Sequence, residues 1–71
     1  MTDIPNAIRN ARLASNLTQK ELADRIGESQ QYLDKIEHGQ RVVTLPTAIR
    51  IAAATGMTLD ELVKEENGNG N

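Results

Sequence analysis

Apolar residues recur along most of this chain at the three- and four-residue spacing of amphipathic helices. In the first half of the chain, the positions that set this spacing are Ile4, Ile8, Ala11, Leu22, Ala23, Ile26, Leu33 and Ile36. Such spacing gathers the apolar side chains on one face of each helix and leaves the polar side chains on the other. No stretch of useful length alternates apolar and polar residues as a half-buried strand does. The pattern therefore predicts an all-α fold.

Caps and glycines divide the chain into five predicted helices. Thr18 and Thr58 are each followed three residues later by a glutamate, a pattern in which the hydroxyl and the glutamate each satisfy a free N–H of the first turn. Gly27, Gly39 and Gly56 mark helix ends, because glycine adopts the left-handed conformation there without a steric penalty. The predicted helices span residues 5–15, 19–26, 30–38, 45–55 and 59–65.

The fourth predicted helix is apolar nearly all round. Its apolar positions are Leu45, Ala48, Ile49, Ile51, Ala52, Ala53 and Ala54. Only Arg50 and the flanking threonines interrupt them, and a helix without a polar face is expected to be surrounded by the others. Pro46 falls in its first turn, where the missing N–H costs nothing.

The length of 71 residues leaves room for one domain with a thin core. A domain of about 60 residues buries only about 60% of the surface that its unfolded chain exposes, so a deep substrate cleft is not expected. We predict one domain over residues 1–65. Residues 66–71 hold no apolar side chain and are predicted to be a disordered tail.

The composition argues against an enzyme and against a membrane protein. The chain has no cysteine and one histidine, and its carboxylates are scattered, so we expect no catalytic residues, metal site, cofactor or small-molecule substrate. We find neither a signal peptide nor an apolar run of the roughly 18 to 20 residues that cross a bilayer. These features predict a cytoplasmic protein.

The charge distribution says more than the net charge of −2, which alone counts against a nucleic-acid partner. Residues 1–43 carry six Lys or Arg and six Asp or Glu, whereas residues 44–71 carry two and four. The acidity therefore belongs to the C-terminal third, and residues 1–43 are neutral overall.

The second and third helices have the spacing of a helix-turn-helix. Only residues 27–29 connect them, and so short a connection makes two helices cross steeply. Ser29 is the expected N-cap of the third helix. The apolar residues of that helix come late, so its first turn should project from the body and present Gln30 and Gln31.

From Ile8 to about Leu62, the chain closely resembles the lambda-repressor and Cro-like helix-turn-helix family. The resemblance rests on the stretches "IRNARLASNLTQKELADRIG", "SQQYLDKIEHGQR" and "TGMTLDELV". In the two-helix unit, the family's opening glutamine, small packing residue, turn glycine and two core positions fall on Gln19, Ala23, Gly27, Leu33 and Ile36. The resemblance implies a compact five-helix DNA-binding domain with its helix-turn-helix at the second and third helices.

The resemblance further implies that the third helix enters the major groove of double-stranded DNA. The candidate base contacts are Gln30, Gln31, Tyr32, Asp34 and Lys35. A glutamine amide can pair with the N6 and N7 edge of adenine, and each good bidentate contact gives about 1–3 kcal/mol of discrimination. Exposed glutamines are ordinary on helix surfaces, but the leading turn of this motif favours base recognition. Tyr32 either contacts DNA or packs beside the turn.

Phosphate contacts are expected around the same helix. The candidates are Arg9, Thr18, Gln19, Ser29, His38, Gln40 and Arg41. His38 lies in the last turn of the third helix and is either a pH-sensitive phosphate contact or a cap for helix carbonyls. So few basic groups predict modest DNA affinity and a shallow salt dependence, since each neutralised phosphate adds about 0.9 to the slope of log K against log salt.

The resemblance also carries expectations about stability and assembly. It pairs Arg12 with Glu37, either as a buried lock between the first and third helices or as an exposed pair of little consequence. One short recognition helix covers few base pairs, so a homodimer on an inverted repeat is expected. The dimer surface is assigned to Met57, Leu59, Leu62 and Val63. The other interpretation is that these side chains close the core.

The sequence thus predicts a sequence-specific transcriptional regulator, and in particular a repressor, in a bacterial cell or a phage-infected host. Phage immunity repressors, Cro-like switch proteins and restriction-modification controllers share the features described above. The alternative is an antitoxin, or a phage excision or anti-repression partner, that acts mainly by protein–protein contact through the acidic C-terminal segment.

Overall fold

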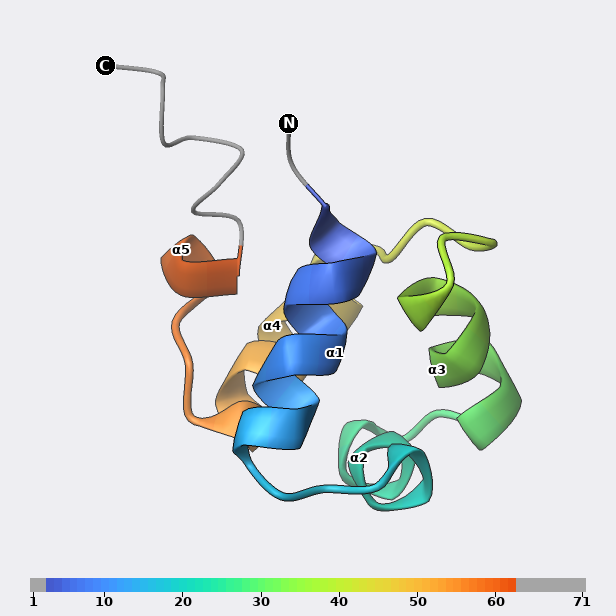
Figure 1. Cartoon of the computed structure of the whole chain (residues 1–71), viewed down its shortest axis with the longest axis horizontal. Helices are drawn as coiled ribbons and strands as arrows, with labels where there is room; N and C mark the ends of the chain where they lie inside the picture. The colour runs from blue at the N-terminus through green and yellow to red at the C-terminus, as the bar shows by residue number, and fades with distance from the viewer. Residues whose placement is uncertain (1–2, 63–71) are drawn as a thin grey trace.

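A computed structural model describes residues 3–62 of the chain, and in that range the elements are five helices (Figure 1). They are α1 (Ile4–Ala14), α2 (Gln19–Ile26), α3 (Gln30–Glu37), α4 (Leu45–Thr55) and α5 (Leu59–Leu62). All five predicted helices are confirmed, with α1 shifted back by one residue and α3 shorter by one. Residues 63–65 of the last predicted helix, and the predicted tail over residues 66–71, lie outside the described residues.

The helix-turn-helix forms because each of its helices is capped. At the start of α2, the Glu21 N–H donates to Thr18 Oγ1 at 3.0 Å and the Thr18 N–H donates to Glu21 Oε1 at 2.8 Å, which completes the predicted capping box. Gly27 ends α2 with φ of 73°, a left-handed conformation that an L side chain rarely adopts. At the start of α3, Ser29 Oγ accepts the Tyr32 N–H at 3.0 Å.

The core lies where α1, α2, α3 and α4 meet. Its largest fully buried side chains are Ile8, Leu22, Leu33, Ile36 and Ile51. Four helices contribute to it, and α5 adds Leu62, which is only 3% exposed. Because no residue of α3 before Leu33 is buried, the core fixes this helix from behind and leaves Gln30 and Gln31 exposed.

The prediction that α4 would be surrounded by other helices is wrong. Leu45 is 62% exposed and Ile49 is 51% exposed, one turn apart on the same helix. The buried residues of α4 are Thr47, Ala48, Ile51 and Ala52. A chain this small has too few elements to cover both faces, so α4 packs on one side against α1, α2 and α5. None of the helices within residues 3–62 has the length and apolarity to cross a membrane.

Candidate nucleic-acid interface

The first turn of α3 and the start of α2 form a polar surface with an open hollow of about 520 Å³. The residues that line it are Gln19, Gln30, Gln31, Asp34, Lys35 and Gln40. All six are among the DNA contacts predicted from the sequence. Gln30, Gln31 and Lys35 are exposed, while Leu33 and Ile36 on the same helix are buried. The structure therefore brings three predicted base-contact side chains to the surface beside predicted phosphate contacts.

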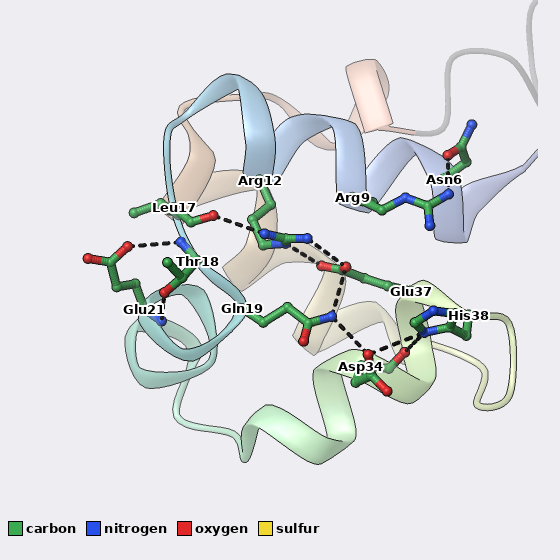
Figure 2. A network of polar contacts seen from close by, with 10 residues as sticks. All are labelled: Asn6, Arg9, Arg12, Leu17, Thr18, Gln19, Glu21, Asp34, Glu37 and His38. Carbon is green, nitrogen blue, oxygen red and sulfur yellow. Dashed lines mark hydrogen bonds and ion pairs between the residues drawn. The ribbon is translucent and has the colours of Figure 1, made fainter.

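An ion pair fixes α3 against α1 (Figure 2). Arg12 donates from Nε to Glu37 Oε2 at 2.7 Å and from Nη2 to Glu37 Oε1 at 3.1 Å. Glu37 is 2% exposed and the Arg12 side chain 12% exposed, so the pair is buried rather than superficial. Arg12 Nη1 also donates to the Leu17 carbonyl at 3.0 Å, which ties the connection before α2 to the same guanidinium.

Gln19 turns its amide toward α3 rather than outward (Figure 2). Its Nε2 donates to Asp34 Oδ1 at 3.0 Å and to Glu37 Oε1 at 3.1 Å. The two N–H groups of this amide are thus both engaged by carboxylates. The sequence placed Gln19 among the phosphate contacts and gave no sign of this bridge, because Asp34 is fifteen residues away in the chain.

His38 caps the end of α3. Its Nδ1 lies 2.8 Å from the Asp34 carbonyl oxygen and 3.3 Å from Asp34 Oδ1. A carbonyl can only accept, so we assign the proton of the neutral ring to Nδ1. The geometry matches the capping interpretation, and it leaves Nε2 as the ring atom available to a ligand.

Tyr32 is half-buried, packs against the core and supports Arg41. The Arg41 guanidinium lies 5.2 Å from the centre of the Tyr32 ring, within the range of a cation–π contact. This contact holds an exposed arginine that directly follows Gln40, a residue of the polar hollow. The sequence gave no signal for the pair, because the turn after α3 brings the two residues together.

A second hollow, of about 330 Å³, opens beside the end of α3. Its lining residues are Asp3, Pro5, Asn6, Arg9, Glu37, His38 and Gly39. Two predicted phosphate contacts, Arg9 and His38, meet there. Arg9 Nη2 donates to Asn6 Oδ1 at 2.6 Å, so Asn6 orients the guanidinium. Sequence reasoning missed Asn6, although its three-residue separation from Arg9 on one helix is a readable signal.

Thr18 and Ser29, two of the predicted phosphate contacts, cap the helices that follow them. Thr18 and Ser29 accept backbone N–H groups through their hydroxyl oxygens. The bonds from the Thr18 backbone N–H and hydroxyl lower the pKa of Glu21 below its ordinary value, since they stabilise the carboxylate. The start of α2 is therefore held in its helical form by a charged cap.

The predicted dimer residues separate into different environments. Met57 and Leu59 are half-buried at the corner between α4 and α5. Leu62 is buried in the core of its own chain, so its side chain is not free to contact a partner. Val63 lies outside the described residues. Within residues 3–62, the large apolar side chains that are exposed are instead Leu13, Val42, Leu45 and Ile49.

Comparison with known protein families identifies this fold. The family model described as helix-turn-helix matches residues 8–62, which is most of the chain. The chain belongs to the lambda-repressor and Cro-like helix-turn-helix family. This helix-turn-helix family consists of DNA-binding transcriptional regulators and is not a class of enzymes.

Individual members of the family show similar sequences and folds. The chain is 44% identical over 52 residues to the uncharacterized HTH-type transcriptional regulator y4dJ of Sinorhizobium fredii, a match that covers 73% of this chain and 68% of that protein. It is 37% identical over 59 residues to the cryptic phage CTXphi transcriptional repressor RstR of Vibrio cholerae, which covers 83% of this chain. The chain spans about half of RstR, 53% of its length.

One solved structure of similar fold is the restriction-modification controller protein C.AhdI from Aeromonas hydrophila. The two chains superpose with a TM-score of 0.79 at 32% sequence identity. The match covers 83% of this chain and 89% of that one. The five-helix arrangement is therefore that of a helix-turn-helix regulator.

Proposed function

We propose that the chain is a sequence-specific transcriptional repressor that binds double-stranded DNA as a homodimer on an inverted repeat. The observation that carries this proposal is the exposed first turn of α3. Gln30 and Gln31 are exposed there, while Leu33 and Ile36 fix the helix from behind. A helix that is polar on its outer face and held on its inner face fits the major groove, which is about 12 Å wide. The proposed place of action is the cytoplasm of a bacterial or phage-infected cell.

In this proposal, the outer face of α3 reads the bases. Gln30 and Gln31 pair with adenine edges, and Lys35 donates to the acceptor edge of guanine. Tyr32 contributes only its exposed part, because the ring packs on the core and under Arg41. Asp34 is the acidic member of the set.

The proposed phosphate contacts surround that face. Arg9, Gln40 and Arg41 donate from their side chains. Ser29 accepts an N–H group through its hydroxyl oxygen and keeps its O–H hydrogen to donate to a phosphate. The Thr18 hydroxyl also contacts the Glu21 carboxylate, so Thr18 donates to a phosphate only by exchanging that carboxylate for it.

Two of the proposed phosphate contacts take a different form from the one first expected. Because Nδ1 of His38 already faces a carbonyl, contact through Nε2 requires the doubly protonated ring. Because the Gln19 amide faces two carboxylates, we assign its phosphate contact to the backbone N–H at the start of α2.

Two surfaces are candidates for the dimer contact. One is the corner with Met57 and Leu59, as the sequence suggested. The other is the exposed face of α4 with Leu45 and Ile49, which sequence reasoning assigned to the core. A dimer on an inverted repeat requires half-sites about one helical turn, or 34–36 Å, apart.

The second candidate function is a protein-contact role as an antitoxin or as a phage excision or anti-repression partner. The observation that favours it is the same apolar face of α4, because exposed apolar patches mark contact sites for proteins. Under this hypothesis the chain acts without selecting a DNA sequence.

Selection from random duplexes tests the proposal. The parent chain should enrich an inverted repeat at low salt, and the double variant Gln30→Ala/Gln31→Ala should lose the enrichment. Asn10→Ala is the matched control, because Asn10 is an exposed amide on α1 that lines neither hollow. If the parent enriches no sequence and the double variant behaves identically, the protein-contact function replaces the proposed one.

A further inference from the structure

The amide of Gln19 bridges two carboxylates that belong to α3. Its Nε2 is 3.0 Å from Asp34 Oδ1 and 3.1 Å from Glu37 Oε1. An amide nitrogen carries two hydrogens, so this geometry gives one to each carboxylate. The bridge joins a deeply buried carboxylate to one that lies at the DNA-facing surface.

The buried end of the bridge is rigid. Glu37 is 2% exposed and receives two bonds from the Arg12 guanidinium. A bidentate pair of this kind fixes the carboxylate in position and orientation. Gln19 is therefore anchored on Glu37, and its second hydrogen is aimed at Asp34 (Figure 2).

The outer end of the bridge faces the polar hollow. The Asp34 side chain is 48% exposed, and Asp34 lines the hollow together with Gln30, Gln31 and Lys35. Both contacts that the described residues make with this carboxylate, from Gln19 and from the His38 ring, fall on Oδ1. Oδ2 is thus the acceptor left for a ligand.

A carboxylate oxygen held in this way accepts hydrogen bonds and cannot donate them. In the major groove, only cytosine N4 and adenine N6 present amino groups, and carboxylates pair typically with cytosine N4. Guanine and thymine present acceptors, which a carboxylate repels. Resting on the proposed function, we propose that Gln19 is a positioning residue that holds Asp34 as an acceptor for a base amino group, with cytosine preferred at one position of each half-site.

This assignment differs in its consequences from a phosphate contact by the Gln19 side chain. A phosphate that approached the amide would meet the negative charges of Asp34 and Glu37, which already hold both hydrogens. Loss of a phosphate contact weakens binding to all sequences alike, whereas loss of a positioned acceptor weakens the base preference at one position of the half-site.

Selection from random duplexes with the full chain separates the two roles. We expect the parent to prefer cytosine at one half-site position. In Asp34→Ala, that preference should fall about tenfold while the base preferences at the other positions are unchanged. Asp34→Asn should move the preference toward adenine, since a carboxamide pairs with the adenine edge. Gln19→Met has a side chain of similar length without a donor, and it should weaken the base preference at the same position as Asp34→Ala. The double variant Gln19→Met/Asp34→Ala should weaken that preference no further.

Gln19→Asn is the second variant, because it keeps the amide on a side chain one methylene too short for the bridge. Helical content and thermal melting establish that each variant is folded. The inference is overturned if Asp34→Ala keeps the preference, or if folded Gln19 variants weaken binding to every sequence equally with the preference intact. Either result leaves the proposed function standing, whereas a parent without any sequence preference removes the proposed function itself.

Discussion

Arg12 and Glu37 are 25 residues apart in the chain and form a buried ion pair with two hydrogen bonds. The pair fixes the end of α3 on α1. Through Gln19, the same carboxylate reaches the start of α2 and the surface residue Asp34. The two helices that present the polar surface, α2 and α3, are thus joined to α1 at one buried charge.

Replacing Arg12 with Leu should unfold the domain cooperatively. The change leaves the Glu37 carboxylate buried without its guanidinium, and breaking a buried pair in this way costs about 3–5 kcal/mol. Thermal and urea denaturation followed by helical signal measure the loss. Arg50→Leu is the control, since Arg50 is exposed on α4. An Arg12→Leu protein that melts within a few degrees of the parent contradicts the structural role.

Acid should weaken the start of α2. The pKa of Glu21 is lowered in the folded chain by its bonds from Thr18, so ionised Glu21 stabilises the fold above its ordinary value of 4.5. That contribution is lost as the pH falls through the lower, folded value. The stability difference between the parent and Glu21→Gln should therefore shrink from about pH 6 to about pH 3. A difference that stays constant over this range rules out the charged cap.

Removing Arg41 should reduce the salt dependence of DNA binding. Each lost phosphate contact lowers the slope of log K against log salt by about 0.9. Tyr32→Leu should produce part of the same loss, because the ring holds the Arg41 guanidinium at 5.2 Å. Arg50→Ala removes an exposed cation on α4, which carries none of the proposed phosphate contacts, and should leave the slope unchanged. Equal losses from Arg41→Ala and Arg50→Ala would mean that only net charge matters.

Two charge substitutions distinguish the candidate dimer surfaces. Ile49→Glu places a carboxylate on the exposed face of α4, and Leu59→Glu places one at the first residue of α5. The variant that shifts sedimentation from dimer to monomer, while keeping the helical signal, identifies the surface. A parent that sediments as a monomer at all concentrations, both free and on its selected duplex, contradicts the dimer proposal.

The helices could be predicted from the sequence because the patterns that define them are local. The capping box at Thr18, the turn at Gly27 and the late apolar residues of α3 all act over a few residues, and they fixed α2 and α3 to within one residue. The exposure of α4 was not readable in this way. Composition shows which residues are apolar, but only the number and placement of neighbouring helices decides which face of α4 is covered.

The sequence predicted which side chains of the candidate site lie at the surface, but not the contacts among them. The position of Gln30 and Gln31 on a capped first turn follows from the sequence pattern. The bridge from Gln19 to Asp34 and Glu37, and the stacking of Arg41 on Tyr32, depend on how separate segments approach each other. No local sequence pattern encodes such contacts. The sequence therefore predicted a phosphate contact for Gln19 and did not predict the contact between Arg41 and Tyr32.

The central claim is that the first turn of α3 inserts its paired carboxamides into the major groove. The most direct measurement is an NMR titration of the labelled chain with its selected duplex, which follows the side-chain amide signals. We expect large shifts for the Gln30 and Gln31 amides and little change for Asn10. Shifts concentrated at Leu45 and Ile49 on α4, with the two glutamine amides unmoved, would contradict it.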